Sequence, residues 1–213
     1  MKRLLQLGIV LGFAGVLAGA YYFPWVSYAR FPSAASVIAN GGRGEQFLVR
    51  LPADRIQAAG SDAAGPRAGP YPAGAALLST EGAATSRVEH FKLRDTTGNV
   101  LGVATRHWTV VDGVPVTAWM LNLPSRGSLV LSGAGEAPDE IEARLRRAGW
   151  SPGTAFAGNL TIDVGGVSRS VAATGEFADI GFQLVETWTV AGVDADGDIS
   201  GTIELNTIGT RGS

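Results

Sequence analysis

The chain contains no cysteine among its 213 residues, and this absence excludes several kinds of chemistry. Disulfide bridges, thiolate metal sites, a cysteine nucleophile and a bacterial lipid anchor on cysteine all need the missing side chain. Histidine is nearly as scarce, because only His90 and His107 could supply an imidazole. They are accompanied by no Ser-His-Asp order and no H-E-x-x-H motif, so the sequence names no catalytic residue.

The chain also lacks an excess of charge of either sign. Lys plus Arg number 17 against 19 Asp plus Glu, so no basic surplus predicts a nucleic-acid partner. The stretch Asp194-Ala195-Asp196-Gly197-Asp198 superficially suggests a calcium loop. Its Gly comes too early, however, and the twelfth position is Leu205 instead of a bidentate Glu. We interpret it as an acidic hairpin loop and expect neither a metal nor a cofactor.

The first thirty residues hold the one long apolar run. Lys2 and Arg3 precede an apolar stretch from Leu4 to Ala20, and aromatic residues follow it. A single-pass transmembrane anchor would span the roughly 30 Å of hydrocarbon and place the aromatics at the far interface. A secretory signal peptide cleaved near Ala20 is the alternative. We predict an inner-membrane anchor over residues 1–30 with a periplasmic domain over 31–213; cleavage would instead leave a secreted or periplasmic protein.

Residues 53–79 are rich in Ala, Gly and Pro, have little to bury and show no periodicity. They predict a long, mobile loop. A nucleotide site is not indicated, because the glycines of this segment lack the strand and helix that a G-x-G-x-x-G motif requires.

The rest of the chain reads as short strands separated by turns, with 30 glycines and 10 prolines overall. We expect about nine strands, one soluble helix over residues 138–148 and no βαβ unit. A small antiparallel β-barrel satisfies this pattern, because closure of the sheet removes exposed strand edges. The expected fold is therefore an all-β barrel with one short helix, preceded by the transmembrane helix.

A three-stranded meander over residues 87–123 is the clearest part of this barrel. Thr96-Thr97-Gly98 suits a three-residue loop that places Asp95 opposite Asn99, and Asp112-Gly113 suits a type I′ turn. With these turns, Glu89 pairs with Thr105 and Phe91 with Val103 on the first hairpin. On the second hairpin, Thr105 pairs with Met120 and His107 with Ala118.

This register defines a candidate ligand cavity. It places one carboxylate, one imidazole and several apolar side chains on a single face, which we expect to point into the barrel. The residues of this predicted site are Glu89, Phe91, Val103, Thr105, His107 and Met120. The opposite face would carry Arg106 beside Trp108 and Trp119, a cation–π group that packing alone could explain.

Two families show similar motifs. Asp95-Thr96-Thr97-Gly98-Asn99-Val100-Leu101-Gly102, the strand after Arg126 and the segment 173–181 resemble the allene oxide cyclase and dirigent barrel superfamily. The stretch 158–171 resembles the YceI-like periplasmic polyisoprenoid-binding barrels, although their Trp-and-His signature is missing. Both resemblances imply a small barrel with an apolar interior.

Three functions fit these features. The first is a membrane-tethered binding module for an apolar or amphipathic small molecule, which needs no catalytic residue. The second, implied by the first resemblance, is a cyclase or isomerase that acts in the barrel cavity. The third is a structural accessory of an envelope complex, with a protein partner.

Overall fold

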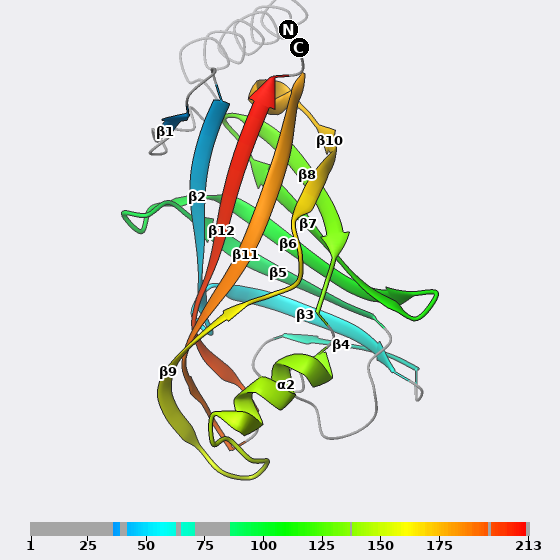
Figure 1. Cartoon of the computed structure of the whole chain (residues 1–213), viewed down its shortest axis with the longest axis vertical. Coiled ribbons are helices and arrows are strands. Elements are labelled where there is room, and N and C mark those ends of the chain that lie inside the picture. Colours follow the sequence, from blue (N-terminus) through cyan, green and yellow to red (C-terminus); the bar gives the residue numbers. More distant parts are fainter. Residues whose placement is uncertain are drawn as a thin grey trace, which may run out of the picture. The chain divides into compact units, whose positions relative to one another are not determined.

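The computed structural model describes residues 36–38, 42–62, 65–70, 86–136, 138–195 and 197–211. Within this part, the protein is an all-β fold in which eight antiparallel strands close into a barrel. Around the barrel the strands follow the order β2 (Gly42–Leu51), β12 (Ile199–Arg211), β11 (Ile180–Val193), β10 (Ser168–Ala173), β8 (Gly127–Ala134), β7 (Val114–Leu123), β6 (Val100–Val111) and β5 (Ser86–Arg94) (Figure 1). The predicted antiparallel barrel is confirmed.

Four further strands extend this sheet. β1 (Ser36–Ile38) pairs with the start of β2, and β9 (Phe156–Asp163) pairs with β11 beyond the barrel wall. β3 (Arg55–Asp62) pairs with β5 and with β4 (Gly65–Pro70), so part of the segment 53–79 that we expected to be loop is strand. Pairing with the free edge of β5 outweighs the low β-propensity of an Ala/Gly-rich sequence. The rest of that segment and the expected anchor over 1–30 lie outside the described residues.

Helix α2 (Pro138–Arg147) confirms the predicted helix. Ile141 and Leu145 lie on its buried face. Gly149, with a φ of 108°, ends the helix in a Schellman motif, in which the Trp150 N–H donates to the Leu145 carbonyl at 3.0 Å. In the part of the chain that the structure describes, no helix combines the length and the apolar character needed to cross a membrane.

The second hairpin of the meander has the predicted register. Val111 faces Val114 across Asp112 and Gly113, both of which have positive φ, as a type I′ turn requires. Thr105 therefore pairs with Met120 and His107 with Ala118, as predicted, so the same side chains of β6 and β7 share a face as in the prediction. The loop 96–98 also has the expected form, with the Asp95 N–H donating to the Asn99 carbonyl at 3.0 Å.

The first hairpin differs from the prediction by one residue. Glu89 pairs with Arg106 instead of Thr105, because a β-bulge lies between the pairs Leu93–Gly102 and Arg94–Val100. Gly102 permits this bulge: a side chain there would place its Cβ 2.0 Å from the Asn122 carbonyl oxygen. The extra residue reverses which faces of β6 and β7 point into the barrel.

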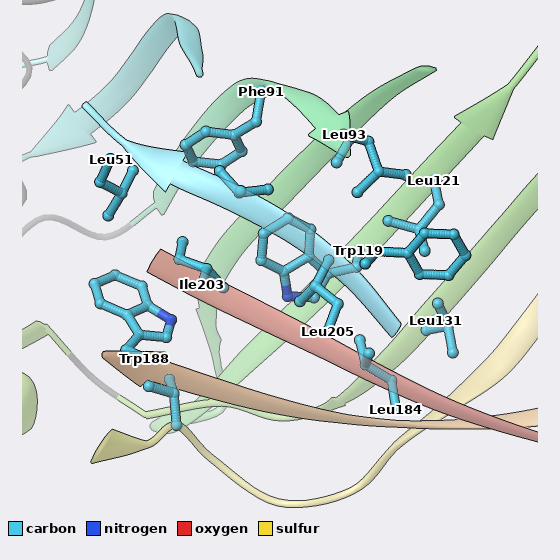
Figure 2. Packing of buried hydrophobic residues seen from close by; sticks show 14 of the residues in the cluster. Leu51, Phe91, Leu93, Trp119, Leu121, Leu131, Leu184, Trp188, Ile203 and Leu205 are labelled. Carbon is cyan, nitrogen blue, oxygen red and sulfur yellow. The ribbon is translucent and has the colours of Figure 1, made fainter. Parts of the chain in front are cut away.

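The barrel interior is packed with large apolar side chains. Trp119, Trp188, Phe91, Leu184 and Leu205 point toward one another from four different strands (Figure 2). Ile141, Leu145 and Trp150 from the helical segment belong to the same buried cluster. The hydrophobic core thus runs from the barrel interior to the underside of α2.

The barrel closes where β2 meets β5, through one residue pair, Leu48 with Arg94. Asp54, fully buried, reinforces this seam from the turn after β2. Its carboxylate accepts from Arg94 Nε at 2.8 Å and from the Arg50 N–H at 2.9 Å, and its carbonyl accepts from the Lys92 N–H at 2.8 Å. Burial alone would raise the pKa of Asp54, but the hydrogen bonds from Arg94 and Arg50 outweigh it and lower the pKa.

Candidate functional site

The barrel holds an unexpected group of buried charges, which we call the interior cluster. It consists of three arginines and three acidic residues: Arg55, Arg87, Arg106, Glu89, Glu186 and Asp198. These residues come from β3, β5, β6, β11 and the loop before β12. Their formal charges cancel, which reduces the cost of removing them from water.

Glu186 is the acceptor at the centre of the cluster. Its two carboxylate oxygens accept hydrogen bonds from the indole nitrogens of Trp119, at 2.7 Å, and Trp188, at 2.6 Å. Arg106 Nε lies 3.2 Å from the same carboxylate, and the Arg106 guanidinium carbon lies 5.2 Å from the centre of the Trp188 ring. The nitrogen-bearing edges of the two indoles face each other across the interior (Figure 2). Charge-assisted bonds of this kind fix the direction of both rings.

The local sequence explains this arrangement. Glu186 and Trp188 are two residues apart on β11, so both side chains point to the same face. Arg106 lies directly opposite Trp119 across the β6–β7 ladder. The bulge at Gly102 turns that pair inward, where it meets Glu186.

Glu89 is the second buried carboxylate. Its Oε1 lies 3.2 Å from Arg55 Nε and 3.4 Å from Arg87 Nε, and its Oε2 lies 3.7 Å from Arg106 Nη1. Burial alone would raise the pKa of Glu89, but the charges of Arg87, Arg55 and Arg106 outweigh burial and hold the pKa below its usual value. Glu89 is therefore an ionised counter-ion and a weak proton acceptor.

Several polar atoms in and beside the cluster are buried without a hydrogen-bond partner among the residues that the structure describes. They include Arg106 Nη2, Trp108 Nε1 and Thr117 Oγ1. Their residues are only 2–3% exposed, and Trp108 lies directly opposite Thr117 on the β6–β7 ladder. Buried polar groups in native proteins are normally bonded, so this set indicates a place for an additional acceptor.

The structure divides the predicted cavity residues between the two sides of the wall. Glu89 and Phe91 point inward and are almost fully buried, as expected. The other four predicted members lie on the outer face of the barrel, so the prediction that they point inward was wrong. These residues are Val103, Thr105, His107 and Met120. The one-residue bulge in β6 is the cause, because it moves every following side chain to the other face. Glu89 and His107 consequently do not meet.

Sequence reasoning missed most of the interior cluster. Arg106, Trp108 and Trp119 were correctly placed on one face, but that face was expected to point outward. Glu186 and Trp188 carried a readable signal, since a carboxylate and an indole two residues apart on a strand share a face. Arg55 lies in a segment that we expected to be loop, so its pairing with Glu89 had no sequence signal.

A second buried ion pair lies elsewhere in the barrel. Arg126 donates to both oxygens of Glu45 at 2.7 Å, and its guanidinium carbon lies 4.9 Å from the centre of the Phe177 ring. Arg43 also pairs with Glu45, and Glu176 adds a second carboxylate to Arg126. The Arg126–Glu45 contact is bidentate, the geometry that makes ion pairs strong. Within the described residues, every buried Arg126 nitrogen has a hydrogen-bond partner, so we assign this group a structural role.

No metal site emerges from the described residues, because they contain no group of three or more His, Asp or Glu side chains suited to an ion. In the acidic loop, Asp194 Oδ1 accepts from the Asp198 N–H at 2.8 Å, which closes a turn. Asp198 in addition reaches Arg55 of the interior cluster, at 3.8 Å.

Comparison with protein-family models finds no match to this chain, and comparison with curated proteins finds none. The two family resemblances therefore remain predictions, and the function has to be argued from the site itself.

Proposed function

We propose that this protein is a membrane-tethered, periplasmic binding module whose barrel holds an apolar or amphipathic small molecule. The observation that carries the proposal is the combination of an apolar barrel interior with polar donors that lack partners. Ligand sites are typically apolar with a few placed polar groups that fix orientation. The apolar run over residues 1–30 supports the tether.

The buried carboxylates favour binding over acid–base catalysis. A general base works best with a pKa near the operating pH, whereas the arginines hold the pKa of Glu89 below its usual value. Glu186 uses both of its oxygens to accept indole N–H groups. Glu89 and Glu186 are thus suited to fixing the positions of the arginine and tryptophan side chains around the interior, and poorly suited to transferring protons.

The proposal is tested by what the purified full-length protein carries. Extraction with organic solvent followed by mass spectrometry should release a lipophilic compound in a fixed ratio to protein. Delipidated protein should then bind an added lipophile with a change in tryptophan emission, because Trp108, Trp119 and Trp188 surround the interior. A stoichiometric protein partner with no releasable compound would instead support the structural-accessory function.

A further inference from the structure

Glu136 is a buried carboxylate in the link between β8 and α2. The residue is only 4% exposed. One carboxylate oxygen, Oε1, lies 2.7 Å from Arg144 Nη2 on α2. The other oxygen, Oε2, is buried and has no hydrogen-bond partner among the described residues. Buried polar atoms are normally bonded, so the negative charge of Glu136 is incompletely compensated.

Arg144 compensates this charge only in part. Within the described residues it is the one cation that pairs with Glu136, and its side chain is 40% exposed. Its other terminal nitrogen, Nη1, donates to the Asp163 carbonyl at 3.3 Å. Water screens an arginine that is this exposed, so the pair offsets less of the cost of burying the carboxylate than a fully buried pair would.

The other described groups near Glu136 do not supply the missing positive charge. Glu140, also on α2, adds a negative charge, and the β9–β10 turn contributes only the Gly165 N–H. The Asp163 carboxylate at the end of β9 accepts a hydrogen bond from β11 at 3.0 Å. Burial raises the pKa of Glu136, and the charge of Glu140 raises it further. These effects outweigh those of Arg144 and the Gly165 N–H, which lower the pKa, so a neutral carboxyl suits this position better than a charged one.

The position of Glu136 connects this charge to the attachment of α2. Ile141 and Leu145 on the helix are 1% and 0% exposed and belong to the buried cluster of the barrel. Release of α2 would therefore expose apolar surface and would also bring Glu136 into water. We propose that Glu136 is a pH-sensitive latch: α2 is held against the barrel more firmly when this carboxyl is protonated than when it is charged.

The direction of the pH dependence follows from linkage. Below the ordinary glutamate pKa of 4.5, the carboxyl is neutral whether α2 is docked or released. As the pH rises through the higher pKa of the docked state, the cost of the buried charge appears and the helix is held less firmly. Each unit between the two pKa values changes the equilibrium between docked and released α2 by about tenfold.

Hydrogen exchange of the full-length wild type and Glu136→Gln, measured by mass spectrometry at several pH values from about 4 to 8, tests this inference. Peptides spanning 138–150 contain the Ala148 and Trp150 amides, which bond to the last turn of α2 at 3.0 Å. Comparing the two proteins at the same pH cancels the intrinsic pH dependence of exchange. The two proteins should be equally protected at about pH 4, and Glu136→Gln should be several-fold more protected at about pH 8.

Glu142→Gln is the matched control. It removes the same charge from the outer side of α2, where Glu142 pairs with Arg146 at 2.7 Å, and should give no gain in protection that grows with pH. Peptides that contain the 95–99 turn should exchange alike in all variants.

Arg144→Met tests the latch without changing the carboxyl. It removes the counter-ion, so the loss of α2 protection between about pH 4 and pH 8 should become larger than in the wild type. Lower protection of Glu136→Gln than of the wild type at about pH 8, or a ratio between them that does not vary with pH, would overturn the latch. Either result would leave the proposed binding function untouched.

Discussion

Replacement of Glu186 by Gln tests whether the interior cluster stabilises the barrel. The carboxylate accepts hydrogen bonds from Trp119 and Trp188 and forms an ion pair with Arg106, whereas an amide offers one oxygen and a nitrogen that can only donate. One indole N–H would then face another donor, and Arg106 would lose its closest counter-charge. Breaking a buried ion pair by removing one partner costs about 3–5 kcal/mol.

This cost would be a large part of the total, because single domains are stable by only about 5–15 kcal/mol. Each kcal/mol lowers Tm by roughly 2–4 °C in a domain of this size, so we expect a decrease of about 6–20 °C. Urea unfolding followed by tryptophan fluorescence and by far-UV circular dichroism measures the change. The m value should stay constant, which would show that the native state itself is destabilised.

Glu204→Gln is the matched control. Glu204 lies on the neighbouring strand β12 and accepts from the partly exposed Gln46 at 3.0 Å. Its replacement should change the free energy of unfolding by no more than about 0.5 kcal/mol. A loss below about 1 kcal/mol for Glu186→Gln would refute the reasoning, since it is less than one charge-assisted hydrogen bond provides. Adding Arg106→Met to Glu186→Gln should recover part of the loss, because it removes a buried cation that has lost its closest counter-charge and keeps only the longer contact to Glu89.

Three further changes test other parts of the fold. Gly98→Ala should cost about 1–2 kcal/mol in a thermal melt, because the φ of 93° at this turn is strained for a residue with a Cβ; an unchanged Tm would contradict that turn. Asp54→Asn should cost about 1.5–3 kcal/mol by urea unfolding, since Arg94 would lose its charged acceptor at the seam. Glu89, with its lowered pKa, contributes stability that is complete above about pH 4.3 and is lost as the pH falls through its folded-state pKa. The stability difference between the wild type and Glu89→Gln should therefore shrink on acidification, and a difference that grew would reverse the assigned direction.

Local turn chemistry made part of the fold predictable. Asp112-Gly113 determines the register of β6 and β7, because only a few residue types accept positive φ at both central positions of the turn. Helix α2 was equally readable from its charges, its apolar stripe and the glycine that ends it. These features depend on neighbours only a few residues away.

The interior face was not predictable in the same way. The bulge depends on the close approach of Gly102 to the backbone of Asn122, a contact between residues on different strands. Sequence pattern favoured Val103 and Met120 as core because they are apolar, and Arg106 as surface because it is charged. The charged residues of β3 and β11, which are distant in sequence, stabilise Arg106 in the interior. Their proximity to Arg106 follows from the closed barrel and cannot be read from the local sequence.

The seam between β2 and β5 has a consequence for how the barrel opens. All other neighbouring strands of the wall share ladders of more than one residue pair, whereas these two share a single pair and depend on Asp54. Opening at that line would break few hydrogen bonds, so the Arg50 and Lys92 amides should exchange with solvent earlier than those of β11 and β12. If the barrel holds a ligand as proposed, we expect this line to be its exit route and expect its residence time to depend on the contact between Asp54 and Arg94.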